Sequence, residues 1–264
     1  MNNNYNTFYI IKNLFFFSLA IMLNNFVGLI SSIVVNIFIA QLGDRYLAAN
    51  SLSYTFFLSI KLLSYGIISI SSICASHALG NKNLADFKHV FINIIYIVLF
   101  LVFVDIILLY TTKYIFILTK QPADIIKISK QFLHVIIFCL FPMLCYSALQ
   151  QFLLVLRKTF ILNVLSCLQA SSIIILSYLF IDIYKMQLAG YAYALTISSW
   201  MIFIIILIYI NLNKKLAVYN FLSELLNFDF EQIKRLFFNG LAIGFALVIE
   251  SLYLFILSIL LGHI

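Results

Sequence analysis

The chain has 264 residues, of which 64% are hydrophobic and only 9% are charged. Soluble domains contain about 45–50% apolar and about 25% charged residues, so this composition excludes an ordinary soluble domain. Lys and Arg exceed Asp and Glu by seven charges. The basic residues are spread through the loops rather than gathered on one face, so no nucleic-acid partner is expected.

The apolar runs last about twenty residues and are separated by short charged loops, which is the pattern of membrane-spanning helices rather than of a β-barrel. We therefore expect an all-α, multi-spanning membrane helix bundle with membrane lipid as its surroundings. The predicted spans are residues 13–41, 50–77, 89–111, 130–155, 160–181, 188–212 and 238–262.

The first residues carry no basic segment and no cleavage site of small residues follows, so we expect the first span to be retained. If the N-terminus is cytoplasmic, nine loop Lys and Arg lie inside and six outside, with Lys61 in a span. This bias favours a cytoplasmic N-terminus in a multi-pass protein of the cell (inner) membrane.

One face of the predicted helix 50–77 is polar. At helical spacing, Leu58 is the apolar member of a stripe that otherwise consists of hydroxyl and amine side chains. Such a stripe lines a cavity in the bundle or forms hydrogen bonds between helices. The polar members of the stripe are Tyr54, Lys61, Tyr65, Ser69, Ser72 and Ser76.

Lys61 and Asp105 are ionisable residues placed inside predicted spans. An unpaired ammonium in hydrocarbon is costly, and a lysine stem is long enough to reach an acid at a slightly different depth. We expect a Lys61–Asp105 pair, which serves either as a structural link or as a transport element.

The remaining polar features have weaker interpretations. The helix 160–181 carries Asn163, Ser166 and Gln169, followed by Ser171 and Ser172, which either line a cavity or join helices. Pro142 predicts a kink in the helix 130–155. His134 is interpreted as an interfacial residue rather than a proton carrier.

The four cysteines form no C-x-x-C pair, and no histidine lies at metal-ligand spacing from them. No nucleophile–base constellation or phosphate loop is present either. Neither a cofactor, a metal site nor an enzyme activity is predicted.

A polar connection separates the sixth and seventh spans. Asp229 with Gln232 is typical of a helix start, and apolar residues at helical spacing predict a surface helix that ends near Phe237. The domains are therefore a six-helix lobe at 1–212, a cytoplasmic linker at 213–237 and the first helix of a second lobe at 238–264. Aligning Leu42-Gly43 with Leu261-Gly262 gives weak support for a duplication.

Glu250 is a glutamate inside an apolar run. An acid in such a place can bind a cation or exchange a proton, as ion-coupled transport requires. The alternative is a neutral carboxylic acid that is hydrogen-bonded between helices.

Four motifs resemble the multidrug and toxic compound extrusion (MATE) family. The segment 41–49, QLGDRYLAA, resembles the junction between its first two helices, and 75–83, ASHALGNKN, the end of its second helix. The segment 190–198, GYAYALTIS, is similar to the opening of helix six. From Gly240 to Glu250 the spacing is that of helix seven, with Ala242 in the usual place of a proline.

This resemblance implies a twelve-helix antiporter of two related six-helix lobes that exports cationic, amphipathic drug-like compounds in exchange for sodium ions or protons. Glu250 then matches the cation-site glutamate of helix seven. The usual acid of helix one is replaced by Val35 beside Asn36, and the helix-five positions fall near Gln169 to Ser172, also without an acid.

The chain holds one lobe and one helix of the other, so we expect a truncated exporter of doubtful activity alone. A separately encoded C-terminal lobe is a possible partner. The alternatives are a lipid-linked saccharide flippase of the same superfamily, and a non-transporting membrane remnant or assembly subunit. The candidate site is Glu250 for the coupling ion, with cavity-lining candidates Lys61, Tyr65, Ser69, Ser72, Asp105, Asn36, Asn163 and Gln169.

Overall fold

A computed structural model describes residues 3–213 and 229–261; inside the helices some side chains, including that of Glu250, lie outside the described set. Within these ranges seven helices are long and apolar enough to cross a membrane, which confirms the predicted all-α, multi-spanning class. They are α1 (Asn3–Ala40), α2 (Asp44–Gly80), α3 (Leu84–Leu118), α4 (Ala123–Val155), α5 (Thr159–Tyr178), α6 (Gln187–Leu212) and α8 (Phe230–Leu261).

Short turns join the consecutive helices from α1 to α6. Two residues after the last residue of α2, α3 and α4 stands a basic residue with left-handed backbone, namely Lys82, Lys120 and Arg157. After α2, for example, the Lys82 amide donates to the Leu79 carbonyl at 3.0 Å and the Asn83 amide to that of Ala78 at 2.9 Å. These bonds satisfy the last carbonyls, and a cation at this end suits the helix dipole.

The end of α5 differs from its predicted form. A π-helical turn, η1 (Leu179–Ile183), follows α5, and the Tyr184 amide donates to the Leu179 carbonyl at 2.9 Å. Gly190 of α6 packs against this turn, since a Cβ built on it would lie 3.0 Å from Phe180. The absence of a side chain at Gly190 therefore allows the start of α6 to pack directly against the π turn.

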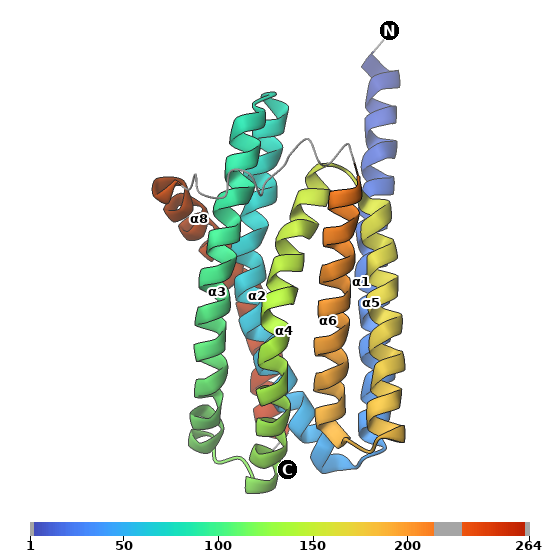
Figure 1. The fold of residues 1–264 in the computed structure, drawn as a ribbon, viewed down its shortest axis with the longest axis vertical. Coiled ribbons are helices and arrows are strands. Elements are labelled where there is room, and N and C mark those ends of the chain that lie inside the picture. The colour runs from blue at the N-terminus through green and yellow to red at the C-terminus, as the bar shows by residue number, and fades with distance from the viewer. Residues whose placement is uncertain (1–2, 214–228, 262–264) are drawn as a thin grey trace.

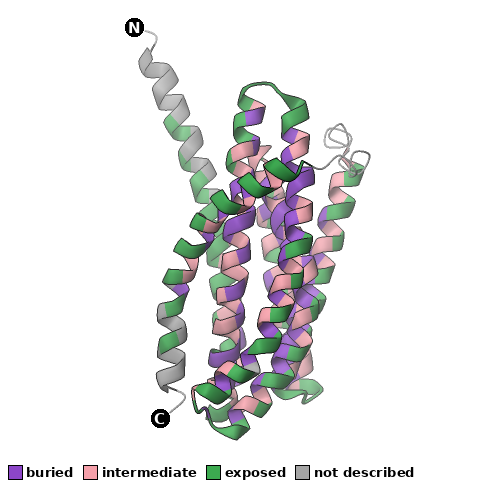
Figure 2. Ribbon diagram, turned by 90° about the vertical axis from the view of Figure 1, so that its left-hand side faces the viewer, coloured by how far each residue is buried: buried purple, intermediate pink, exposed green. Residues whose placement is uncertain are grey.

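The helices form two groups, one of α2, α3 and α8 and the other of α1, α5 and α6, with α4 between them. The α1 helix packs on α5, α4 packs on α6, and α2 contacts α3, α4 and α8. In Figure 1, α8 runs obliquely across α2 on the left-hand side of the view, whereas α1, α5 and α6 stand on the right-hand side. Figure 2 shows that buried residues face the interior of the bundle and exposed residues its outer surface.

Two apolar clusters fill the core at opposite ends of the bundle. One contains Phe87 and Phe152, whose ring centroids lie 5.8 Å apart, and the other contains Phe132 and Tyr191, also 5.8 Å apart. Along each of α2, α3, α4 and α6, the first cluster is separated from the second by a short stretch near mid-height. These stretches contain Lys61, Ser64, Asp105, Pro142, Ser198 and Ser199.

The predicted surface helix before the last span is corrected by the structure. Residues 230–237 are the first turns of α8 itself, with no break before the apolar part. Asp229 begins the helix as expected, because its Oδ1 accepts from the amides of Glu231 and Gln232 at 2.9 and 3.2 Å. Residues 214–228 of the predicted linker lie outside the described residues.

Candidate functional site: a polar cavity and a helix crossing on two faces of α2

A cavity of about 160 Å³ lies between α1, α2, α4, α5 and α6. A single buried water needs about 10–15 Å³ of such space, so the cavity has room for several waters or one small organic ion. Its polar lining residues are Ser31, Ser32, Tyr54, Lys61, Ser166, Gln169 and Tyr191, and its apolar ones are Gly28, Met143, Ala170, Ile173 and Leu195. Of the predicted cavity residues, Lys61 and Gln169 are thus brought together.

The predicted Lys61–Asp105 pair is wrong. Both side chains are described, and no ion pair joins them. Lys61 points toward the cavity beside α5 and α6, whereas Asp105 of α3 meets α2 at Ser64. Since Ser64 lies about 60° around the helix from Lys61 at 3.6 residues per turn, the two groups face different neighbours.

Asp105 is fully buried and is held by one hydroxyl group. The Ser64 Oγ lies 2.9 and 2.8 Å from the two carboxylate oxygens and can donate its hydrogen to either. Asp105 is not among the residues that line the cavity. It therefore links α3 to α2 at mid-height, rather than contributing charge to the cavity.

Asn24 of α1 is bonded to Ser166, a residue that lines the cavity. The Ser166 Oγ of α5 donates to the Asn24 Oδ1 at 2.8 Å, and the Asn24 Nδ2 donates to the Leu162 carbonyl at 3.4 Å. Ser31 donates to the Ala170 carbonyl at 3.4 Å. These bonds join α1 to α5. Asn24 is not predicted from the sequence, because the adjacent pair Asn24 and Asn25 in a long apolar helix gives no helical periodicity.

A second cavity, of about 100 Å³, lies nearer the α4–α5 turn. Asn24, Asn25, Tyr65 and Asn163 line it, together with Gln150. The Tyr65 hydroxyl accepts from Gln151 Nε2 at 3.3 Å. Two predicted residues, Tyr65 and Asn163, therefore lie in a cavity separate from that of Lys61 and Gln169.

Three other predicted cavity residues have structural contacts instead. The hydroxyls of Ser69 and Ser72 donate to carbonyls of their own helix, those of Gly66 and Ser69, at 2.7 and 2.8 Å. Asn36 lies near the end of α1 and accepts from Asn50 Nδ2 at 3.0 Å. None of the three lines either of these cavities.

The opposite side of α2 carries a close crossing with α8. A Cβ built on Gly66 would lie 2.4 Å from the Gly244 Cα, and one on Gly240 or Gly244 would lie 2.6 or 2.7 Å from the carbonyl oxygen of Ile67 or Leu63. Only residues without a side chain permit this approach. Gly66 is about 140° around the helix from Lys61 at 3.6 residues per turn, so crossing and cavity occupy different faces.

The crossing extends along α8 to Ser251, whose Oγ lies 3.1 Å from the Oγ of Ser59 on α2. At its other end, Asn93 of α3 holds the start of α8. The Asn93 Oδ1 accepts from the Asp229 amide at 3.1 Å, and its Nδ2 donates to Gln232 Oε1. Glu250 precedes Ser251 on the same helix; its side chain lies outside the described residues.

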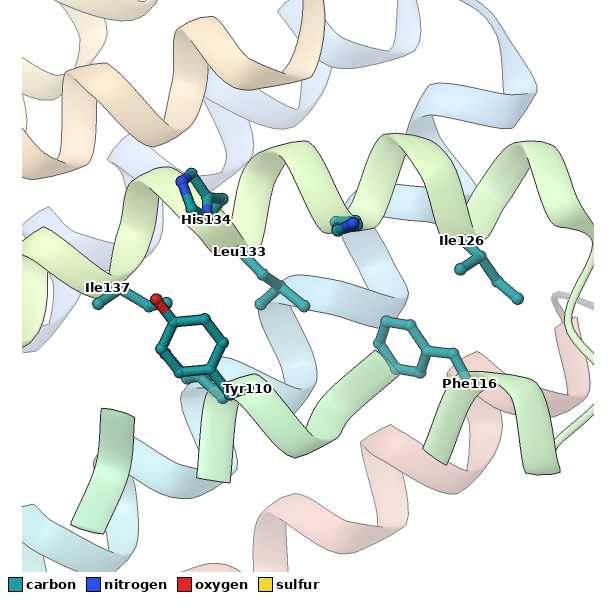
Figure 3. A pocket seen from close by; sticks show the side chains of 8 residues that line it. Tyr110, Phe116, Ile126, Leu133, His134 and Ile137 are labelled. Carbon is teal, nitrogen blue, oxygen red and sulfur yellow. The ribbon is translucent and has the colours of Figure 1, made fainter. Parts of the chain in front are cut away.

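A third cavity, of about 110 Å³, opens between α3 and α4 and is mostly apolar. Figure 3 shows Tyr110 and Phe116 of α3 facing Ile126, Leu133 and Ile137 of α4 across it. His134 lies at its edge and is exposed, in keeping with an interfacial role. Its lining is apolar apart from Lys130, His134 and the Tyr110 hydroxyl.

Among the described residues no group of His, Cys, Asp or Glu is arranged to hold a metal ion. The cavity at Lys61 contains one ammonium group with hydroxyl and amide groups around it. These groups can bind a small polar or anionic molecule.

Comparisons with known proteins agree with this architecture. The MatE family model matches residues 20–162. The "Probable multidrug resistance protein NorM" of Bacillus anthracis is 26% identical over 191 residues, which cover 70% of this chain and 42% of that protein. The chain therefore spans less than half the length of this curated relative.

Two solved structures have the same fold. The eukaryotic MATE transporter AtDTX14 superposes with a TM-score of 0.84 at 18% identity, covering 95% of this chain and 56% of that one. An inward-facing multidrug resistance MATE family transporter of the MOP superfamily gives 0.76 at 17% identity, with 85% and 51% covered. Because the family model covers more than half of the residues, the chain belongs to the MatE family of membrane proteins.

Proposed function

We propose that the chain supplies one six-helix lobe and the first helix of the other lobe to a MATE-type exporter of cationic, amphipathic compounds, driven by sodium ions or protons. The observation that supports this most is the crossing of α2 and α8. Alternating access requires two repeats that move against each other, and a side-chain-free backbone contact between a helix of the first lobe and the helix after it suits such a boundary.

Glu250 is the proposed coupling residue. Its sequence neighbour Ser251 is buried against Ser59, so the Glu250 backbone lies where α8 meets α2. The first lobe offers no replacement for it in the cavity, because Val35 is buried among apolar residues and Asn36 is bonded to Asn50. Asp105 is enclosed by α2 and α3.

The flippase alternative is less well supported. A lipid-linked saccharide carries a large, multiply charged head, whereas the cavity at Lys61 is about 160 Å³ and, among its lining residues, has one formal charge. A non-transporting role makes no use of the α2–α8 contact.

The test uses the protein in its own cells. Deleting the coding sequence should raise accumulation of ethidium, a cationic amphipathic dye, and returning the wild-type chain should restore low accumulation. The Glu250→Gln variant should fail to restore it. Glu231→Gln, which changes an exposed glutamate at the start of the same helix, should restore it fully.

Membrane levels of all variants are compared by immunoblot, so that loss of the protein is not read as loss of transport. If deletion leaves ethidium accumulation unchanged in both sodium-containing and sodium-free medium, the export proposal is wrong and a non-transporting role remains. If Glu250→Gln restores export as well as wild type does, the coupling role of Glu250 is wrong.

A further inference from the structure

Lys61 has an unusual environment for a lysine inside a membrane protein. It lies near the middle of α2, between the two apolar clusters of the core. Among the described residues it makes no hydrogen bond or ion pair. An ammonium group away from bulk water without a counter-charge is costly, so lysines at such depth are usually paired with an acid.

No helix around the cavity supplies that acid. The lining residues come from α1, α2, α4, α5 and α6, and within this described set none is Asp or Glu. The acid at the same height, Asp105, faces Ser64 on another side of α2. The described wall of the cavity therefore contains no acid that a change of side-chain conformation could bring to Lys61.

The cavity wall offers several hydrogen-bond donors to a ligand beside Lys61. Tyr54 and Tyr191 stand next to each other, with ring centroids 6.0 Å apart, and Gln169 and Ser32 lie on the α5 and α1 sides. Hydroxyl and amide groups that surround a cation are the donors that bind a carboxylate. Met143, Ile173 and Leu195 give the same cavity an apolar portion.

From this arrangement we propose that the cavity binds a small organic monoanion, whose carboxylate pairs with Lys61 and whose apolar body packs against Met143, Ile173 and Leu195. The bound anion supplies the counter-charge that the described lining residues of the cavity lack. The proposal concerns binding to this chain alone and does not rest on the export of cationic compounds.

Three probes of nearly equal shape test the proposal: benzoate, the neutral benzamide and the cationic benzamidine. Binding of each radiolabelled probe to the purified full chain in uncharged detergent is measured by equilibrium dialysis at fixed ionic strength. Benzoate should bind saturably, and the other two should bind at least about tenfold more weakly, because they lack the carboxylate that makes a charge-assisted hydrogen bond with Lys61.

Variants then locate the site. Lys61→Gln should weaken benzoate binding by roughly ten- to a hundredfold, while Lys61→Arg, which keeps the charge, should retain most of it. Lys127→Gln, which removes an exposed lysine of α4, should bind benzoate as wild type does. Circular dichroism melting of each variant confirms that it is folded before binding is measured.

Three results would overturn the proposal, the first two of which concern benzoate. One is benzoate binding that is absent, or no tighter than that of benzamide, which would mean that Lys61 is held as an uncharged amine. The other is equal benzoate binding by wild type and a folded Lys61→Gln variant, which would place the anion elsewhere. Saturable binding of benzamidine in preference to benzoate would also contradict it, and would instead favour a cationic ligand in this cavity.

Discussion

Two faces of α2 differ in how closely their neighbours approach: one packs tightly against α8 and the other borders a cavity. Toward α8 the helix presents Gly66 and bare backbone, and the approach leaves no space for a Cβ. Toward α1, α5 and α6 it presents Tyr54 and Lys61, and the space in front of them stays open. The difference shows that one helix can present a closely packed face and an open polar cavity at directions only about 140° apart around its axis.

The largest expected effect is on the tightly packed face. Gly66→Ala places a methyl group 2.4 Å from the Gly244 Cα, and because both partners are backbone, the helices must separate. We expect a loss of about 1–3 kcal/mol in the free energy of unfolding, as for other overpacked sites, measured by denaturant unfolding in mixed micelles.

Gly28→Ala is the matched control on α1, at the wall of the cavity, where nothing lies within 4 Å of the added Cβ. It should leave stability unchanged or raise it by up to about 1 kcal/mol, because alanine favours helix. A disulfide between Ser59→Cys and Ser251→Cys, in a chain without other cysteines, reports whether α8 remains docked. If Gly66→Ala is as stable and as readily cross-linked as Gly28→Ala, the crossing is not close-packed.

An effect of similar size is expected at a third position around α2, at Ser64 and Asp105. Ser64→Ala removes the bond to a buried carboxyl group and should cost about 1–3 kcal/mol of unfolding free energy. In a double-mutant cycle, Ser64 and Asp105 should couple by about 0.5–3 kcal/mol, as expected for residues in contact. Lys61 and Asp105 should couple by less than about 0.5 kcal/mol, and stronger coupling would restore the pairing that the structure lacks.

The smallest effect is expected at the surface. Arg45 Nη1 lies 3.0 Å from Asp124 Oδ2, joining the first turns of α2 and α4, but both side chains are mostly exposed. Arg45→Ala should change the unfolding free energy by about 0–1 kcal/mol. The difference between variant and wild type should shrink further in 1 M salt, and a cost that persists there would indicate packing rather than charge.

The spans could be predicted from the sequence because each apolar run is long enough to cross a membrane, and α1 to α6 follow at short intervals. The π turn after Tyr178 could not, since its residues are as apolar as the helix before them. The surface helix was predicted as a separate element because polar residues suggest a loop, whereas the structure continues them into α8.

The site was predicted in part. Periodicity placed Tyr54 and Lys61 on one face, and both line a cavity. Depth along a helix was not enough to pair Lys61 with Asp105, because direction around the helix decides which neighbour a side chain meets. The Gly240–Gly244 spacing is a recognisable signal for close helix packing, but its partner Gly66 became evident only from the structure.

The anchor at Asn93 determines how α8 can move. Asn93 holds the first turn of α8 to α3 through Asp229 and Gln232, and the glycine crossing lies only a few turns further along. Sliding of α8 along its own axis would break these bonds, whereas swinging about its first turn would leave them in place and break the contact of Ser251 with Ser59. Displacement of α8 relative to α2 should therefore be small at the glycine crossing and should increase toward Ser251 and Glu250, the part of the helix farthest from Asn93.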